Sequence, residues 1–162
     1  MKKNIISGFT FIELIVFMGI FSILLFIIIN LFISVLSIKL ESESTSRNQQ
    51  DGRYILAKLM YDINQAGSII FPSLGSQDNS LEIMVDDNSY RYSVNTNNLQ
   101  LVNQYGTNIL NSYDTEIINL NFQCLGNEGG KNTIKISFSI RSKIKVNNVN
   151  EINSFQTTVG IR

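Results

Sequence analysis

The sequence has no histidine and a single cysteine, Cys124, among its 162 residues. Histidine is the commonest general base and the commonest metal ligand in proteins. Its absence therefore argues against an enzyme that uses acid–base catalysis and against a metal-binding protein. One cysteine excludes a disulfide within the chain, and Cys124, at the end of a predicted strand, fits a small buried apolar residue better than a nucleophile. With no histidine to activate a thiol or a serine, we expect no enzyme, no catalytic residue and no cofactor.

Charge is absent from one long stretch. The chain has 13 basic and 13 acidic residues, a balance that argues against broad affinity for nucleic acids or acidic membranes. No charged residue lies between Leu14 and Ile38, where nearly every position is apolar. At about 1.5 Å per residue, a helix over this run measures about 37 Å, which is enough to cross a hydrocarbon core of about 30 Å. The run therefore predicts a transmembrane helix.

A secretory signal peptide is the alternative interpretation, with Lys2 and Lys3 as its basic region. Signal peptides have a shorter apolar region of about 7–15 residues, and no small-residue cleavage site follows Ile38. We therefore expect the segment to stay in the mature protein. The positive-inside bias places Lys2 and Lys3 in the cytoplasm, which predicts a single-pass protein of the cytoplasmic membrane with its carboxy terminus outside.

Glu13 is the one ionisable residue of the apolar run from Phe9 to Ile38. A charged side chain at mid-bilayer costs about 2.5–3.5 kcal/mol, so Glu13 is a candidate functional residue. The alternative is that Glu13 lies among the lipid headgroups, where this cost nearly vanishes and the helix dipole favours an acid. That alternative does not explain the residues around Glu13.

The residues around Glu13 are similar to a known processing signal. Gly8-Phe9-Thr10-Phe11-Ile12-Glu13 follows a short basic leader and precedes the apolar run. This pattern resembles the signal of type IV prepilins and type II secretion pseudopilins. The resemblance implies that a prepilin peptidase cuts between Gly8 and Phe9 and methylates the new amine of Phe9. It also implies that Glu13 pairs with that amine on a neighbouring subunit and so fixes the axial register of assembly.

Two further features bear on the resemblance. Many major pilins have a helix-breaking proline where this chain has Asn30, whose side chain could bond across helices or to its own backbone; the only proline here is Pro72. The segment Asn48–Gly67 resembles the W-type minor pilins and the J-type minor pseudopilins. The resemblance implies a minor subunit that initiates or caps a filament together with other pilins or pseudopilins and an inner-membrane assembly platform.

The rest of the chain predicts an α+β fold. The segment Glu41–Gly52 is polar all round and predicts a solvated helix or a hinge, and an apolar stripe at helical spacing follows it. Beyond Pro72 apolar residues alternate with a period of two, which predicts one antiparallel sheet packed on the stripe. The stripe consists of Ile55, Leu56, Leu59, Ile63 and Ala66; the predicted strands are Leu81–Val85, Tyr90–Val94, Leu99–Val102, Ile117–Cys124, Thr133–Ile144 and Phe155–Ile161. The predicted organisation is a leader (1–8), a transmembrane and filament-core helix (9–38), an exported amphipathic helix (39–67) and a sheet head (68–162).

A row of cations follows the strand predicted over Thr133–Ile144, on the face opposite its apolar residues and without an anion in the segment. Such a row could contact DNA phosphates, as competence filaments require, or could be a solvated face that blocks aggregation. The second interpretation is favoured because no aromatic residue is interleaved to stack on bases. The cations are Lys131, Lys135, Arg141, Lys143 and Lys145.

Oxygen-bearing residues in two predicted turns, Asp86-Asp87-Asn88 and Asn127-Glu128, are candidates for calcium binding. Neither has the ligand spacing of a known calcium loop, and turn chemistry explains both. We therefore expect no metal site.

These features together predict a non-enzymatic minor pilin or pseudopilin whose filament lies in the periplasm or at the cell surface. The expected partners are membrane lipid, the prepilin peptidase, other pilins or pseudopilins and the platform, with DNA the least favoured. The alternatives are a membrane-tethered binding module that does not polymerise and a tethered hydrolase. Glu13 distinguishes the first alternative, because a simple tether gains nothing from a carboxylate at that position.

Overall fold

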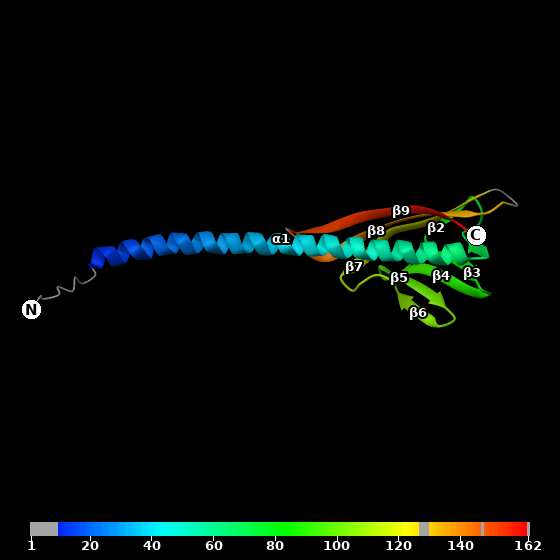
Figure 1. Ribbon diagram of the computed structural model, residues 1–162, viewed down its shortest axis with the longest axis horizontal. Coiled ribbons are helices and arrows are strands. Elements are labelled where there is room, and N and C mark those ends of the chain that lie inside the picture. Colours follow the sequence, from blue (N-terminus) through cyan, green and yellow to red (C-terminus); the bar gives the residue numbers. More distant parts are fainter. Residues whose placement is uncertain (1–9, 127–129, 147, 162) are drawn as a thin grey trace, which may run out of the picture. The chain divides into compact units, whose positions relative to one another are not determined.

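The computed structural model describes residues 10–126, 130–146 and 148–161. One long helix, α1 (Phe11–Gln65), precedes nine β-strands within these residues (Figure 1). The chain divides into two compact units between Leu40 and Glu41, so that α1 contributes residues to both. The second unit, called the head below, contains every strand. The predicted α+β class with a long amino-terminal helix is confirmed.

The head has two antiparallel sheets where the sequence predicted one. The larger sheet has the strand order β1-β3-β4-β5-β6, and the smaller has the order β2-β7-β8-β9. The strands are β1 (Ser68–Phe71), β2 (Gln77–Asp78), β3 (Leu81–Val85), β4 (Asn88–Asn95), β5 (Asn98–Asn103), β6 (Gly106–Ile109), β7 (Thr115–Leu125), β8 (Thr133–Val146) and β9 (Val149–Gly160).

Two tight turns connect β3 to β4 and β4 to β5. Asp86 and Asp87 have φ values of 48° and 61°, and Thr96 and Asn97 have values of 49° and 63°. Consecutive left-handed residues make the turn type whose twist matches an antiparallel hairpin, and aspartate and asparagine tolerate this conformation well. The turn predicted at Asp86-Asp87-Asn88 is confirmed.

The two sheets separate at the connection between β6 and β7. Asn111 is buried there, and its Oδ1 accepts a bond of 2.9 Å from the backbone N–H of Leu99 in β5. Its Nδ2 donates to the carbonyl of Thr115 in β7 at 2.9 Å. One amide side chain thus satisfies backbone groups of both sheets where they part, which a buried connection requires.

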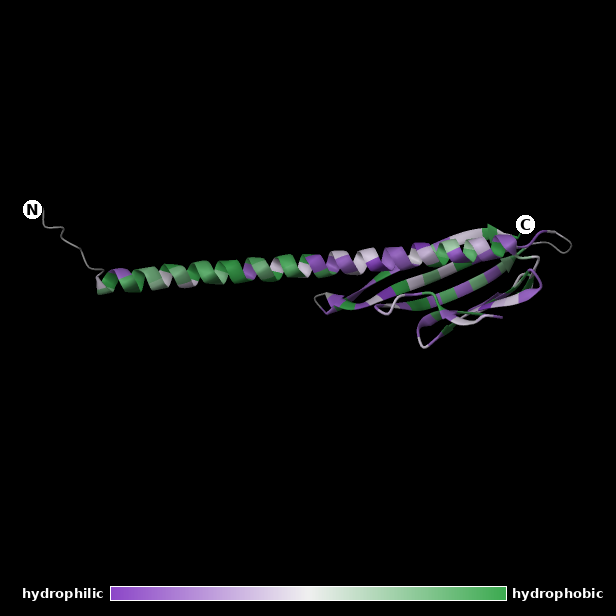
Figure 2. Ribbon diagram, turned by 60° about the horizontal axis from the view of Figure 1, so that its bottom comes forward, coloured by the Kyte–Doolittle hydropathy of each residue, from purple (hydrophilic) through white to green (hydrophobic). Residues whose placement is uncertain are grey.

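The core lies between α1 and the inner faces of both sheets. Ile55, Leu59 and Ile63 are fully buried and Ala66 nearly so, which confirms the predicted stripe. Each fully buried aliphatic side chain contributes about 1.5–3 kcal/mol. Figure 2 shows the alternation of hydrophobic and hydrophilic residues along the strands that face this stripe. The largest buried partners from the sheets are Leu81, Ile83, Tyr92, Leu99, Ile117, Phe122, Ile134, Ile136 and Phe138.

The polar half of α1 within the head is packed on the strands, so the prediction of a solvated helix or a hinge is wrong. Ser44, Asn48, Asp51 and Gly52 are buried along one face. Asn48 Nδ2 donates to the carbonyl of Glu151 at 3.3 Å and to Asn153 Oδ1 at 3.0 Å, both in β9. Hydrogen bonds satisfy the Asn48 amide nitrogen, whereas Asn48 Oδ1 and Ser44 Oγ are buried without a partner among the described residues. An apolar periodicity cannot reveal the burial of such polar side chains.

Two carboxylates of α1 bind groups of the strands and of their connections. Asp51 accepts hydrogen bonds from the backbone N–H of Ser112 at 2.8 Å, from Ser112 Oγ at 2.7 Å and from the hydroxyl of Thr115. Asp62 accepts from Lys58 Nζ at 2.9 Å and from the hydroxyl of Tyr92 in β4. Asp51 therefore links α1 to the connection between β6 and β7 and to the start of β7, and Asp62 links α1 to β4.

Candidate functional site

The first part of α1 exposes apolar side chains on all sides. Every residue from Thr10 to Leu36 is exposed, and the large apolar side chains are between 42 % (Leu25) and 78 % (Phe11) accessible. Within the described residues, α1 is the one helix long and apolar enough to cross a membrane. Figure 2 shows this part as an almost uninterrupted hydrophobic stretch. An exposed apolar surface of this size marks a contact with an apolar partner, either lipid or protein.

Glu13 and Thr10 form a capping box at the start of α1. The Thr10 backbone N–H and hydroxyl donate to Glu13 Oε2 at 2.9 and 2.8 Å. Glu13 N–H points back at Thr10 Oγ1, at a longer 3.4 Å. This reciprocal pattern satisfies backbone N–H groups that a helix start leaves without partners.

Sequence reasoning identified Glu13 but missed its local partner. The signal was present, because threonine followed three residues later by glutamate marks a helix start. The other predicted residues of the processing signal, Gly8 and Phe9, lie outside the described residues, as does the whole leader 1–8. The predicted cleavage and methylation stay predictions.

Polar residues inside the apolar stretch bond to their own helix. Asn30 Nδ2 donates to the carbonyl of Phe26 at 2.8 Å, which is one of its two predicted roles. Ser22 donates in the same way to Met18 at 2.8 Å, and Ser34 to Asn30 at 2.9 Å. These bonds satisfy the polar groups within the helix, so the apolar surface carries no unsatisfied side-chain donor at these positions.

The predicted cation row follows β8 along its length. Lys135 and Lys145 lie about 30 Å apart along an extended strand at about 3.3 Å per residue, and Lys131 precedes the strand. Lys143 donates to the backbone carbonyl of Tyr113 at 2.8 Å and lies 5.1 Å from the centre of its ring. The cations are thus spread along the strand rather than gathered in one place.

An acid from a neighbouring strand accompanies one of these cations, although their own segment has none. Arg141 forms an ion pair with Glu116, its register partner in β7. The guanidinium holds the pKa of the Glu116 carboxyl below its ordinary value, chiefly through its hydrogen bond. Because that anion lies on a neighbouring strand, the segment's own sequence could not reveal it. DNA binding by the row stays a prediction, with one of its five cations already paired.

The other candidate residues in the described part of the chain have structural roles. Asp86 and Asp87 form the β3–β4 turn, where Asn88 Nδ2 donates to the Asp86 carbonyl at 2.9 Å. Asn127 and Glu128 lie outside the described residues. Cys124 is 1 % exposed in β7, and burial raises the pKa of its thiol, which disfavours the reactive thiolate. Within residues 10–126, 130–146 and 148–161, no group of three acidic or cysteine side chains is placed to bind a metal.

The features with functional potential are therefore the exposed apolar helix, the capped carboxylate at its start and the surface of the head. Comparison with known proteins found no matching family model, no matching curated protein and no matching solved structure.

Proposed function

We propose that this protein is a minor pilin or pseudopilin, a membrane-anchored subunit that is built into a pilin-like filament. Segment 9–38 would serve first as the membrane anchor and then as the helix of the filament core. The observation that carries the proposal is the carboxylate of Glu13 at the start of the apolar part of α1, where every residue as far as Leu36 is exposed. A simple lipid anchor does not need an acid there, whereas ordered assembly of identical apolar helices needs one specific contact.

The capping box is compatible with this role. Both bonds from Thr10 end on Oε2 of Glu13, and the described residues provide no hydrogen bond to Oε1. Cleavage after Gly8 would create a positively charged amine at Phe9, one residue before Thr10. In a neighbouring subunit such an amine could approach Oε1 while the local cap stays intact, and two opposite charges attract strongly in an apolar surrounding.

The remaining parts of the proposal follow from the same signal. Lys2 and Lys3 keep the amino terminus in the cytoplasm, where the prepilin peptidase would cut, and the head lies outside. Assembly would take place on an inner-membrane platform with other pilins or pseudopilins, and the filament would lie in the periplasm or at the cell surface. The protein itself would catalyse no reaction.

Processing is tested by mass spectrometry of the protein from cells with an active prepilin peptidase. The expected chain begins at N-methylated Phe9, and Gly8→Arg is expected to abolish cleavage because a bulky side chain blocks close approach of the backbone to the protease. A wild-type chain that still begins at Met1 in such cells contradicts the proposal.

A membrane-tethered binding module that does not polymerise is the competing function, and it would explain Glu13 as a helix cap alone. Two variants separate these roles. Glu13→Gln keeps the capping box, since glutamine serves in it as well as glutamate, but removes the charge. Thr10→Ala removes the cap and keeps the charge.

The proposal expects Glu13→Gln to be nearly absent from sheared filaments, with Thr10→Ala incorporated close to the wild-type level. Immunoblotting of filament and membrane fractions measures this ratio. The reverse order, with Glu13→Gln incorporated and Thr10→Ala lost, would assign Glu13 to the cap and remove the main support for a filament subunit.

A further inference from the structure

The loop between β6 and β7 is held firmly while it exposes an aromatic side chain. Asp51 binds Ser112, and Arg47 forms an ion pair with Asp114. The backbone N–H of Lys143 donates to the Asp114 carbonyl at 2.8 Å. Yet Tyr113, in the middle of this loop, is 89 % exposed, the highest value for a large apolar or aromatic side chain in the part of the chain that the structure describes.

One exposed side chain contacts Tyr113, and two more lie further along the same β8–β9 hairpin. Lys143 binds the Tyr113 carbonyl and lies against its ring. Lys145 is exposed two residues further along β8, and Val149, at the start of β9, is 68 % exposed. Val146 and Val149 are register partners in the hairpin that joins these strands. Tyr113, Lys143, Lys145 and Val149 together are called the foot of the head.

The foot lies at the end of the head where the head joins the apolar helix. Asp114 of the loop binds Arg47, and Glu151 of β9 accepts a hydrogen bond from Thr45. At about 1.5 Å per residue, Thr45 and Arg47 are about 6 and 9 Å along α1 from Glu41, the first residue of the head. A peptide bond joins Glu41 to Leu40, the last residue of the apolar unit. This end of the head therefore stays next to the apolar segment whatever the orientation of the head.

The composition of the foot fits a lipid surface. An aromatic ring with a polar tip, long lysine stems and an exposed aliphatic side chain are the residue types that gather at membrane interfaces. The acids nearby are largely engaged: Glu43 and Asp114 bind Arg47, and Glu151 binds Thr45. Glu41, at the start of the head, is a further exposed acid.

We propose that the foot rests on the headgroups of the bilayer that anchors the protein and favours anionic phospholipids. This proposal depends on the membrane span of the proposed function. Tyr113 and Val149 enter the headgroup region, and Lys143 and Lys145 contact lipid phosphates. The contact orients the head on the membrane before assembly and is given up when the subunit leaves the bilayer.

The absence of tryptophan from the sequence allows a direct test. Three single-tryptophan variants of the full chain are placed in phosphatidylcholine vesicles, with or without phosphatidylglycerol, in which some acyl chains are brominated near the headgroup or near the bilayer centre. Tyr113→Trp reports on the foot. Tyr61→Trp is the matched control, an exposed tyrosine of the head about 30 Å along α1 from Glu41. Phe26→Trp reports on the anchor.

We expect Tyr113→Trp to lose most of its emission to lipids brominated near the headgroup, and Tyr61→Trp to lose none. Lys145→Glu in the Tyr113→Trp background is expected to reduce this loss in vesicles with phosphatidylglycerol. Lys131→Glu, an exposed cation before β8, is the matched charge control and leaves the loss unchanged.

Two results overturn the proposal in distinguishable ways. Quenching of Phe26→Trp near the bilayer centre with no loss from Tyr113→Trp keeps the anchor and rejects the foot. No quenching of Phe26→Trp by either lipid rejects the membrane span, and the foot with it. Equal quenching of Tyr113→Trp and Tyr61→Trp also rejects the foot, because the contact would then not be confined to the tethered end of the head.

Discussion

Gly52 sets the distance between α1 and β9. A Cβ atom built on Gly52 would lie 2.1 to 2.4 Å from ring atoms of Phe155, far inside van der Waals contact. We expect Gly52→Ala to lower the free energy of unfolding by about 1–3 kcal/mol through overpacking, despite the better helix propensity of alanine. Thermal unfolding of the full chain in detergent, followed by circular dichroism, measures the change.

Two variants show whether the Phe155 ring is the cause. Gly67→Ala is the matched control, since a Cβ at Gly67 meets no atom within 4 Å. Phe155→Leu frees space beside Gly52, so the cost of Gly52→Ala should shrink in that background. An unchanged cost in the double variant would place the origin of the effect elsewhere.

Ionisation of Tyr92 is expected to lower the free energy of unfolding at alkaline pH. Burial, and then the hydrogen bond and charge of Asp62, raise the pKa of the Tyr92 phenol above its ordinary value of about 10. The folded protein therefore keeps a proton that the unfolded chain releases. The protonated phenol makes its full contribution to the free energy of unfolding below about pH 10. This contribution is lost as the pH rises toward the pKa of Tyr92 in the folded protein.

Tyr92→Phe should have two effects. The free energy of unfolding at neutral pH falls by about 1–3 kcal/mol, because Asp62 loses a partner in a buried site. Above about pH 10 the decline of stability with pH becomes less steep than in the wild type. Urea denaturation at a series of pH values measures both effects, and parallel alkaline slopes for the two proteins would refute the assignment to Tyr92.

At the scale of elements, sequence periodicity predicts the buried residues in one half of α1 and not in the other. Ile55, Leu59 and Ile63 could be predicted as a buried stripe, since apolar residues at helical spacing have one physical explanation. The buried face at Asn48 and Asp51 could not, because its burial depends on partners that lie far away in sequence. Burying a polar side chain is favourable chiefly where a specific group meets it, as Ser112 and Thr115 meet Asp51, and composition does not identify that group.

Asp51 provides a test of this buried polar face. Asp51→Ala leaves the backbone N–H of Ser112 and the hydroxyl of Thr115 without their acceptor, so we expect a loss of about 1.5–3 kcal/mol. Hydrogen exchange should become faster in the loop around Ser112 and in the helix before Gly52, while the helix around Leu59 stays protected.

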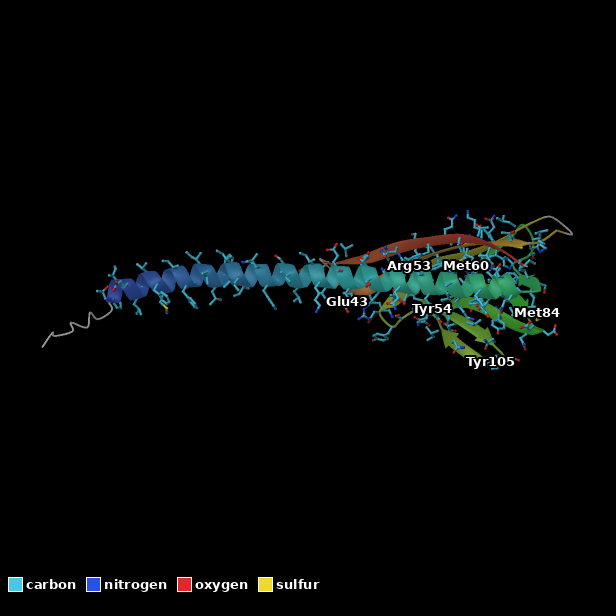
Figure 3. The ribbon with its side chains drawn as sticks, viewed as in Figure 1. Glu43, Arg53, Tyr54, Met60, Met84 and Tyr105 are labelled. Atoms are coloured by element: carbon cyan, nitrogen blue, oxygen red, sulfur yellow. The ribbon has the colours of Figure 1, made fainter. Side chains whose placement is uncertain are left out.

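Arg53→Ala is the control for Asp51→Ala, as an exposed side chain two residues away on the same helix (Figure 3). It should change neither stability nor the exchange pattern. Faster exchange spread evenly over all of α1 in Asp51→Ala would mean that the polar and apolar halves unfold as one unit, contrary to this prediction.

Among the strands too, some features could be predicted from neighbouring residues, whereas others depend on residues that are far apart in sequence. The turn at Asp86-Asp87 follows from two residues that tolerate positive φ, and alternation marks the strands beside it. In the turn at Thr96-Asn97 only the asparagine favours this conformation, since threonine is branched at Cβ. Where the two sheets separate, Asn111 bonds to both β5 and β7, and residues far apart in sequence thus meet at a point that local patterns do not mark. Likewise β9 begins at Val149, earlier than the predicted Phe155, because pairing with β8 extends it through residues without clear alternation.

At the scale of the whole molecule, the hydrophobic core of the described residues belongs to the head alone. Every buried large apolar side chain of the described residues lies between Ile55 and Val159, inside the head. The apolar part of α1 before Glu41 contributes no buried side chain to this core. The acid of the candidate site and the apolar run could therefore be predicted from sequence, whereas the foot could not, because it assembles Tyr113, Lys143 and Val149 from three separate segments.

A fragment that begins at Glu41 should therefore fold by itself. It retains the whole core and the contacts of Arg47, Asn48 and Asp51, so we expect a cooperative thermal transition close to that of the full chain in detergent. A shorter fragment that begins at Arg53 loses those contacts and uncovers the ring of Phe155, and should unfold at a clearly lower temperature. Equal transitions for the two fragments would show that the polar half of α1 adds nothing to the head, and a fragment from Glu41 without a cooperative transition would show that the head needs the apolar segment to fold.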